Sequence, residues 1–224
     1  NYLEILQDGD KFILLNATEF DYTNIWYKYF DLGKNYNYIK DTLSTDITMR
    51  KAVEFSPGMR LLRQDSWEAL VSFIISQNNN IKRIKGILKN ICQQFNRFPT
   101  PRDIYDNDLS PFRLGFRDKY LKDCAEKILS GEVNLDKNTT AEDLKKIYGV
   151  GDKVAACVLL YGLYKTEAFP VDVWIKKAVK EYYPNGFPKE FFDIQGIAQL
   201  YLFNFIRKVQ NVTPVAEILQ YVEN

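Results

Sequence analysis

Residues 147–157 read Ile-Tyr-Gly-Val-Gly-Asp-Lys-Val-Ala-Ala-Cys and predict two helices joined by a tight glycine turn. Glycine allows tight turns and close backbone approaches, which suits Gly149 and Gly151 to this position. The second helix starts directly after the turn, and its free N–H groups favour an anion such as a DNA phosphate. We therefore predict a helical hairpin that binds phosphate through Gly149, Val150 and Gly151.

A lysine and an aspartate stand at two successive helix starts. Lys153 lies in the first turn of the second helix, where the helix dipole disfavours its ammonium form. A neutral lysine amine can act as a nucleophile and form a Schiff base. Asp172 follows Pro170-Val171 and can cap the next helix, so both groups can meet in one cleft. Taken alone, the pattern also fits a surface lysine on an αα-hairpin and a purely structural cap.

The rest of the chain is predicted to be mostly α-helical. Asp65 with Glu68 resembles a capping box, and Lys11 to Leu15 resembles a strand. Apolar residues at three- and four-residue spacing predict helices near 66–77, 81–92, 119–129, 141–148, 152–164, 173–183, 195–209 and 214–222.

Composition excludes several classes of enzyme. The 224 residues include no histidine, which excludes Ser-His-Asp and Cys-His catalysis and any His-ligated metal. Cys92, Cys124 and Cys157 are scattered without a C-x-x-C motif, which argues against a zinc ribbon or an iron–sulfur cluster. No apolar run approaches the roughly 20 residues that span a membrane.

The charge distribution suggests one basic face. The net charge of the chain is only +1, so the total charge does not indicate a nucleic-acid partner. Residues 76–124, however, carry 10 Lys and Arg against 5 Asp and Glu, while residues 1–50 carry 5 against 8. A solvated helix face would also explain this asymmetry.

Several motifs together resemble one family. Tyr148 to Cys157 with Phe169-Pro-Val-Asp172 resembles the helix-hairpin-helix Gly/Pro-Asp DNA glycosylases. Met59-Arg-Leu-Leu-Arg-Gln-Asp65 and Ser72-Phe-Ile-Ile-Ser-Gln-Asn-Asn-Asn-Ile81 resemble specifically the 8-oxoguanine DNA glycosylase/AP lyases. The resemblance runs from about residue 10 to the C-terminus.

The resemblance implies a mostly α, two-lobed helix-hairpin-helix glycosylase fold. We expect residues 1–50 to be the remnant of an N-terminal α+β domain with a linker helix, and residues 51–224 to form two helical lobes with a cleft between them. The family's N-terminal domain supplies a glycine carbonyl that detects the N7 hydrogen of 8-oxoguanine. We expect that part of the domain to precede residue 1.

The resemblance also implies a bifunctional base-excision repair enzyme that removes 8-oxoguanine. Lys153 matches the lysine that attacks C1′, forms a Schiff base and supports β-elimination of the abasic strand. Asp172 matches the aspartate that assists at the sugar. No cofactor is required, but the carbonyls of Ile147 and Val150 match those that hold a structural Na⁺ or K⁺.

Further positions match the family's contacts with the extruded base and with the opposite strand. Cys157 and Phe203 match a pair that sandwiches the purine, although both residue types commonly pack in cores. Gln199, four residues before Phe203, matches the residue that hydrogen-bonds the base. The residues matched to the opposite base and the wedge are Asn78, Arg83, Phe116 and Arg117. Arginines alone are often surface groups; here the pair predicts a preference for cytosine opposite the lesion.

The expected partner is damaged double-stranded DNA, with the protein a monomer that is not bound to a membrane. We expect it in the cytoplasm, at the nucleoid, of a bacterium or in a eukaryotic nucleus. Two alternatives remain open. One is an enzyme of the same superfamily with another lesion specificity, and the other is a non-catalytic helix-hairpin-helix module that binds DNA.

Overall fold

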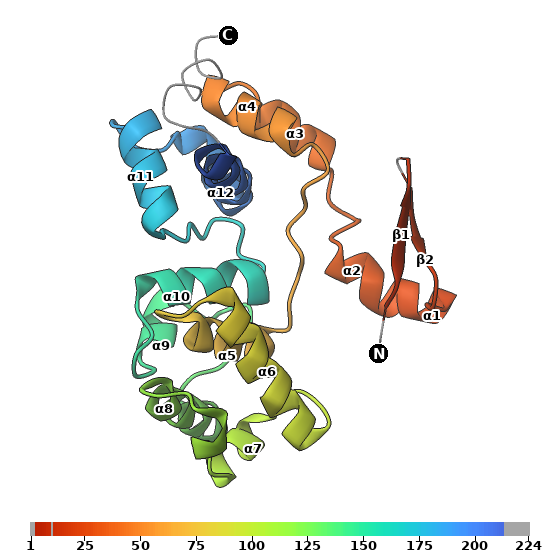
Figure 1. Cartoon of the computed structure of the whole chain (residues 1–224). Coiled ribbons are helices and arrows are strands. Elements are labelled where there is room, and N and C mark those ends of the chain that lie inside the picture. Colours follow the sequence, from red (N-terminus) through yellow and green to blue (C-terminus); the bar gives the residue numbers. More distant parts are fainter. Residues whose placement is uncertain (1–2, 10, 213–224) are drawn as a thin grey trace.

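The structure is a computed structural model that describes residues 3–9 and 11–212 and is mostly helical. Two groups of helices form its body, and a β-hairpin stands apart on one side (Figure 1). The elements in chain order are β1 (Ile5–Asp8), β2 (Lys11–Leu14), α1 (Glu19–Asp21), η1 (Tyr22–Trp26), α2 (Tyr27–Tyr29), α3 (Tyr36–Leu43), α4 (Ile47–Phe55), α5 (Ser66–Ser76), α6 (Ile81–Phe95), α7 (Pro101–Asp106), η2 (Ser110–Phe112), α8 (Arg117–Ser130), α9 (Ala141–Lys145), α10 (Asp152–Cys157), η3 (Val158–Gly162), α11 (Val173–Tyr182), η4 (Lys189–Ile194) and α12 (Gln195–Val212).

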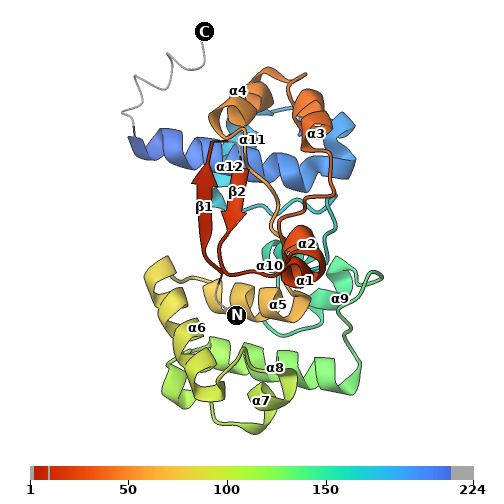
Figure 2. The ribbon, with the colours of Figure 1, turned by 90° about the vertical axis from the view of Figure 1, so that its right-hand side faces the viewer.

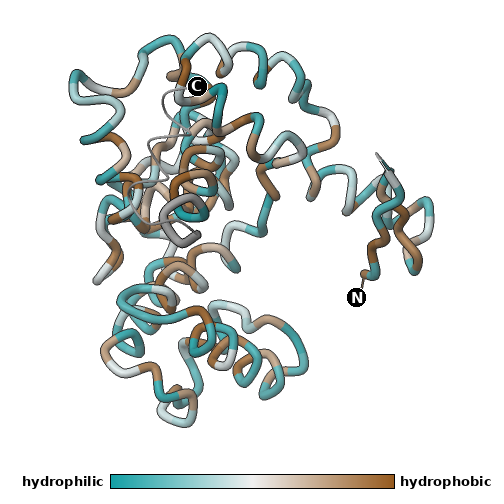
Figure 3. The backbone as a smooth tube through the Cα atoms, turned by 45° about the horizontal axis from the view of Figure 1, so that its top comes forward, coloured by the Kyte–Doolittle hydropathy of each residue, from teal (hydrophilic) through white to brown (hydrophobic). Residues whose placement is uncertain are grey.

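The first two strands form an antiparallel hairpin in which Ile5 pairs with Leu14 and Asp8 with Lys11. Its residues are exposed, except that Leu14 is half-buried. The hairpin itself carries apolar residues, although it lies outside the helical body (Figure 3). The sequence predicted β2 but missed β1, because Ile5-Leu6-Gln7-Asp8 lacks the alternation of apolar and polar residues that marks a half-buried strand.

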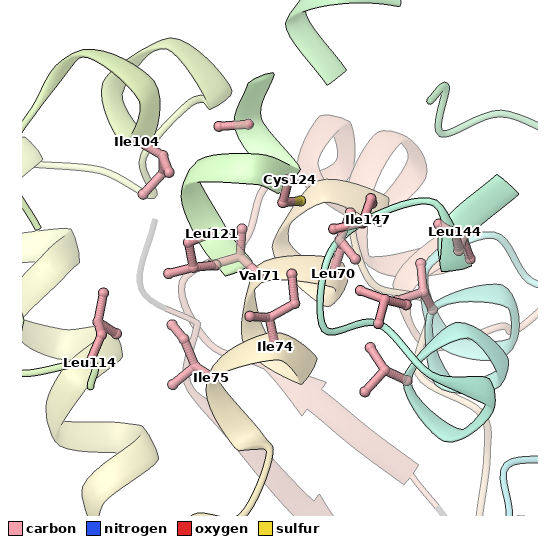
Figure 4. Packing of buried hydrophobic residues seen from close by; sticks show 14 of the residues in the cluster. Leu70, Val71, Ile74, Ile75, Ile104, Leu114, Leu121, Cys124, Leu144 and Ile147 are labelled. Atoms are coloured by element: carbon pink, nitrogen blue, oxygen red, sulfur yellow. The ribbon is translucent and has the colours of Figure 1, made fainter. Parts of the chain in front are cut away.

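One hydrophobic core is built from a continuous part of the chain. It extends from Leu70 on α5 to Leu159 on η3, and we call residues 66–159 the hairpin lobe. Figure 4 shows α5 side chains such as Ile74 packed beside Leu121 of α8 and Ile147 of the hairpin. The core of this lobe therefore holds the glycine turn between α9 and α10 in place.

The second core joins two distant parts of the chain. Its buried residues come from 36–61 and 160–206, which we call the terminal lobe. The helices α3 and α4 lie beside α11 and α12 in both ribbon views (Figures 1 and 2). The predicted domain boundary after residue 50 stays a prediction. In the structure, buried residues between 36 and 50 share the core of the C-terminal helices.

A single helical segment belongs to both lobes. Val154, Ala155 and Val158 pack in the hairpin lobe, whereas Leu160 packs in the terminal lobe. The segment continues from α10 into the π-helix η3, so the predicted helix from 152 to about 164 is confirmed up to Gly162. Any side chain on the remaining face of this segment lies between the lobes.

Most of the other predicted helices agree with the structure where it describes them, but the helix predicted at 141–148 is α9 and ends at Lys145. Segments near 66–77, 81–92, 119–129 and 173–183 correspond to α5, α6, α8 and α11. The helix predicted at 195–209 is α12 and reaches Val212, and the one predicted at 214–222 lies outside the described residues. The helices α3, α4 and α7 were not predicted.

Candidate active site

The glycine turn has the geometry that its sequence predicted. Gly149 has φ +82°, and a Cβ atom on it would lie 2.4 Å from the ring of Tyr120. Gly151 is the N-cap of α10 and has no atom within 4 Å of its would-be Cβ. The N–H of Val150 donates to the carbonyl of Ile147 at 3.0 Å and closes the turn. The exposed start of α10 can therefore accept an anion on its free N–H groups.

Lys153 is exposed in the first turn of α10. Its Nζ lies 5.7 Å from the ring centre of Phe73, which α5 supplies. Phe73 in turn packs on Tyr161 with 5.6 Å between ring centres. Lys153, Cys157 and Tyr161 follow one another at four-residue spacing, so they occupy one face of the shared helical segment.

The charges of Lys153 and Asp172 meet at Cys157. Burial raises the pKa of the Cys157 thiol to about 11, which Lys153 opposes and Asp172 reinforces. Burial raises the pKa of Tyr161, and Cys157 and the same carboxylate add to that shift. Asp172 also caps α11 by accepting from the N–H groups of Trp174 at 3.0 Å and Ile175 at 2.8 Å. The amine and the carboxylate, from two helix starts, thus both influence the same buried thiol.

Gln199 and Phe203 lie on α12, which packs in the same core as Leu160 of that segment. Gln199 is 5 % exposed, and its side-chain oxygen is buried without a hydrogen-bond partner. A buried acceptor that lacks a partner costs free energy until a donor reaches it. Phe203 is half-buried, and the guanidinium of Arg207 lies 5.8 Å from its ring centre. Gln199 is therefore a candidate acceptor for a hydrogen bond from a ligand.

A cavity of about 520 Å³ lies between the lobes beside these residues. Lys153, Cys157 and Gln199 are not among its lining residues, but its walls share Phe73 and Tyr161 with the lysine site. The lining residues are Met59, Arg60, Leu62, Gln64, Glu68, Ala69, Ser72, Phe73, Tyr161 and Leu200. The cavity therefore adjoins the lysine site rather than coinciding with it.

The three asparagines between α5 and α6 have different positions. Asn78 is exposed with φ +46°, a left-handed conformation that asparagine tolerates. The Asn79 side chain donates to the carbonyl of Ile75 at 3.0 Å, and Asn80 caps α6 by accepting from the N–H of Arg83 at 2.9 Å. Asn78 is thus the member of the triplet whose side chain carries no such structural bond.

The two predicted arginines differ sharply in burial. Arg83 is exposed and donates to the carbonyl of Arg113 at 2.8 Å. Arg117 is 2 % exposed, and its guanidinium donates to the carbonyls of Gln77, Asn78 and Leu114. Burial and the nearby Arg83 lower the pKa of Arg117. In this state Arg117 holds the loop between α5 and α6, whereas Arg83 offers an accessible guanidinium.

Phe116 is exposed beside these arginines at the start of α8. Its side chain is 46 % exposed, and the guanidinium of Arg117 lies 4.4 Å from its ring centre. The structure therefore groups Asn78, Arg83, Phe116 and Arg117 around the junctions that begin α6 and α8.

Sequence reasoning missed Phe73 and Tyr161 as side chains at the site. Tyr161 could have been found, because it continues the four-residue spacing of Lys153 and Cys157. Phe73 gives no such signal, because its helix is apolar over most of its length and nothing local separates the core face from the site face.

Comparison with known families accounts for this arrangement. The family model of the HhH-GPD superfamily base excision DNA repair proteins matches residues 71–190. The model of the 8-oxoguanine DNA glycosylase N-terminal domain matches residues 2–70. The chain belongs to the 8-oxoguanine glycosylase/lyases of the HhH-GPD superfamily. The predictions of this family, of its two-lobed fold and of a DNA glycosylase with lyase activity are confirmed.

Individual relatives agree with this assignment. A probable N-glycosylase/DNA lyase of Methanothermobacter thermautotrophicus is 28 % identical over 80 % of this chain and 72 % of its own length. The N-glycosylase/DNA lyase of Saccharomyces cerevisiae is 31 % identical over 70 % of this chain, and the match spans half of the yeast protein. The match with the archaeal relative therefore extends over more of both chains.

A solved structure shares the fold closely. The 8-oxoguanine glycosylase/lyase of Clostridium acetobutylicum, bound to double-stranded DNA with cytosine opposite 8-oxoguanine, is 36 % identical with a TM-score of 0.83. The match covers 93 % of this chain and 82 % of that one. The 3-methyladenine glycosidase of Bacillus halodurans is 21 % identical with a TM-score of 0.64 and shows the shared fold alone.

Residues 3–9 and 11–212 contain neither a membrane-spanning helix nor a cluster of metal-binding side chains. No helix in that range is long and apolar enough to cross a membrane. No group of three or more Cys, Asp or Glu side chains in it could hold a metal ion.

Proposed function

We propose that this chain removes 8-oxoguanine from double-stranded DNA, preferentially opposite cytosine, and then cleaves the abasic strand. The observation that carries the proposal is that Lys153 and Asp172 stand at two helix starts, one in each lobe, and that both are near enough to Cys157 to influence the pKa of its thiol. A nucleophilic amine beside a carboxylate suits a sugar that develops positive charge as its base departs.

The proposed reaction begins when the neutral amine of Lys153 attacks C1′ of the damaged nucleotide. The bond from C1′ to the base breaks, its electron pair leaves with the base, and the base takes up a proton. The attacking nitrogen gives up one proton, and the C1′–O4′ bond then breaks with its electron pair going to O4′, which takes up a proton. A protonated Schiff base between Lys153 and C1′ remains. Removal of a proton from C2′ then expels the 3′ phosphate, which is β-elimination. Asp172 would stabilise the cationic sugar while its cap bonds keep the carboxylate in place.

The unpartnered oxygen of Gln199 supports recognition of an extruded purine. The pairing edge of 8-oxoguanine presents N–H donors, as guanine does, and one of them would satisfy this buried acceptor. Cys157 and Phe203 would cover the two faces of the base. Burial keeps the Cys157 thiol protonated at neutral pH, because its pKa is about 11, so it would contact the base as a neutral group.

The exposed group around Phe116 supports contacts with the opposite strand. Phe116 would wedge into the base stack, and Asn78 would fill the space that the extruded base leaves. Arg83 is accessible and would read cytosine through its O2 and N3 acceptors. Arg117 would do so only after exchanging some of its bonds to Gln77, Asn78 and Leu114.

The turn of the hairpin would complete the DNA contact. The N–H groups of Gly149 and Gly151 would bind a phosphate while the N–H of Val150 keeps the turn closed, and the carbonyls of Ile147 and Val150 would hold Na⁺ or K⁺. The fit is compatible, because the Ile147 carbonyl accepts one hydrogen bond from Val150 and retains a lone pair. Such an ion would neutralise phosphate charge. We further propose that no cofactor takes part in the chemistry and that the protein acts as a monomer.

Borohydride trapping tests the nucleophile. The protein is incubated with a duplex that carries one 8-oxoguanine opposite cytosine, and borohydride reduces any Schiff base to a stable adduct. We expect an adduct with the unaltered chain, none with Lys153→Gln, and an adduct with the exposed control Lys137→Gln. An adduct that persists in Lys153→Gln would exclude this lysine, and no adduct with the unaltered chain would exclude the proposed activity.

A panel of duplexes with each of the four bases opposite 8-oxoguanine tests the cytosine preference. We expect the fastest excision opposite cytosine and a loss of that preference in Arg83→Gln. Equal rates of the unaltered chain on all four duplexes would refute the role of both arginines.

A further inference from the structure

Three aromatic rings connect the start of α8 with the hairpin turn. Phe116 contacts Tyr120 edge-to-face with 5.5 Å between ring centres, and Tyr120 contacts Tyr148 with 5.1 Å and an interplanar angle of 89°. Edge-to-face pairs of this kind are favourable. We call these three residues the aromatic ladder.

The outer rings of the ladder are accessible, whereas the middle ring is packed. Phe116 is 46 % exposed and Tyr148 is 61 % exposed. Tyr120 is half-buried against Gly149, where a side chain would collide with its ring. Because the three rings touch one another, the two accessible rings belong to one contiguous apolar surface, and such surfaces mark places where a ligand or partner binds.

Two side chains of α8 form hydrogen bonds with backbone groups of the same hairpin. The N–H of Tyr148 donates to the carboxylate of Asp123 at 2.7 Å. The ammonium of Lys127, one turn further along α8, donates to the carbonyl of Lys146. The helix that begins at the Phe116 wedge therefore also positions the turn before Lys153.

We propose that Tyr148 is a second aromatic DNA contact and that Tyr120 positions it together with Phe116 as one unit. The proposal rests on the proposed function, because it assumes that the turn binds a DNA phosphate. An exposed ring beside the phosphate-binding N–H groups can pack on the sugar or base of the nucleotide that carries that phosphate. Base–aromatic stacking commonly contributes enough to change affinity tenfold or more.

The contact is tested by the affinity for a duplex with a tetrahydrofuran abasic analogue opposite cytosine, which binds but does not react. We expect Tyr148→Ala to raise the dissociation constant about tenfold and Tyr148→Phe to raise it less than threefold. The matched control is Tyr38→Ala, which removes a ring that is 68 % exposed on α3 and should leave affinity unchanged. Unchanged affinity in Tyr148→Ala would overturn the contact.

Borohydride trapping with the unaltered chain distinguishes failure of this proposal from failure of the proposed function. If that chain gives no borohydride adduct with the lesion duplex, the proposed function fails. If it gives the adduct and Tyr148→Ala binds equally well, only the contact fails.

The positioning role of Tyr120 is tested by a measurement that a loss of protein stability would not by itself change. A 2-aminopurine next to the abasic analogue becomes brighter when a wedge unstacks it. We expect Tyr120→Leu, which still fills the space against Gly149, to lower that increase at least twofold at saturating protein. Tyr120→Phe should preserve it. An unchanged increase in Tyr120→Leu would overturn the role of Tyr120.

Discussion

The hairpin lobe and the terminal lobe are both helical, but they are assembled differently. The hairpin lobe buries side chains from one continuous segment, Leu70 to Leu159. The terminal lobe joins residues 36–61 with 160–206. Lys153 belongs to the first lobe, and Asp172 and Gln199 lie on helices of the second. The candidate site therefore depends on how a local unit and a long-range unit meet.

The shared segment of α10 and η3 explains how the two lobes hold one site. Val154, Ala155, Val158 and Leu159 pack in the hairpin lobe, and Leu160 packs in the terminal lobe. Lys153, Cys157 and Tyr161 lie along the face that remains. Because this segment packs in both lobes, it links the helix start that carries Lys153 to the lobe that carries Asp172.

The largest expected effect separates the chemistry of Asp172 from its role as a cap. Asparagine caps helices as well as aspartate, so Asp172→Asn should keep the fold of the terminal lobe. It removes the charge at the sugar, and we expect excision to slow about 10²- to 10³-fold. The rate is measured by single-turnover cleavage of the lesion duplex.

The control for Asp172→Asn is Asp65→Asn, which alters the cap of α5 in the hairpin lobe in the same way. An equal slowing in both variants would show that capping, not charge at the site, explains the effect.

A second prediction contrasts packing in the two lobes. A Cβ on Gly196 of α12 would lie 2.5 Å from the carbonyl of Ala168 and 2.4 Å from Leu160. We expect Gly196→Ala to lower the free energy of unfolding by about 3 kcal/mol, measured by urea denaturation. Gly86→Ala on α6 meets no atom within 4 Å and should instead stabilise the protein by about 0.5–1 kcal/mol. Equal effects of both variants would contradict the contrast.

A third prediction concerns the joint between the N-terminal segment and the terminal lobe. The buried carboxylate of Asp31 accepts from the hydroxyl of Tyr36 at 2.9 Å and from that of Tyr164 at 2.6 Å. Hydrogen bonds to a charged group stabilise more than neutral ones, so Asp31→Asn should destabilise the fold by about 2 kcal/mol. Urea denaturation at pH 7 measures it, with the exposed Asp41→Asn as control. If Asp31→Asn and Asp41→Asn had the same free energy of unfolding, the proposed stabilising role of Asp31 would be wrong.

The smallest expected effect is a dependence on alkaline pH. The pKa of the Cys157 thiol is about 11 in the fold, against 9 for an ordinary thiol, because of burial. A raised pKa means that Cys157 contributes fully below pH 9 and loses its contribution as the pH rises to 11. The unaltered chain should therefore lose about 1–2 kcal/mol more than Cys157→Ala over that interval. Parallel pH profiles of unfolding would contradict a buried thiol.

Local features of the site were predictable where neighbouring residues determine them. The turn at Gly149 and Gly151 and the cap by Asp172 need only a few adjacent residues, and both are confirmed. Gln199 and Phe203 could be proposed only from resemblance to a family, because an amide and a ring on an apolar helix look like core residues. Their functional roles, like that of Lys153, remain predictions.

By itself, the sequence determined the helical hairpin, the helix starts at Asp65, Thr140 and Asp172, and the family, because short-range sterics and hydrogen bonds specify them. Only the tertiary structure decided that residues 36–61 share a core with 160–206 and that Phe73 lies beside Lys153. It also decided that Arg117 is buried on loop carbonyls while Arg83 stays accessible. Such features depend on contacts between distant residues, and one-dimensional spacing does not encode which distant partners meet.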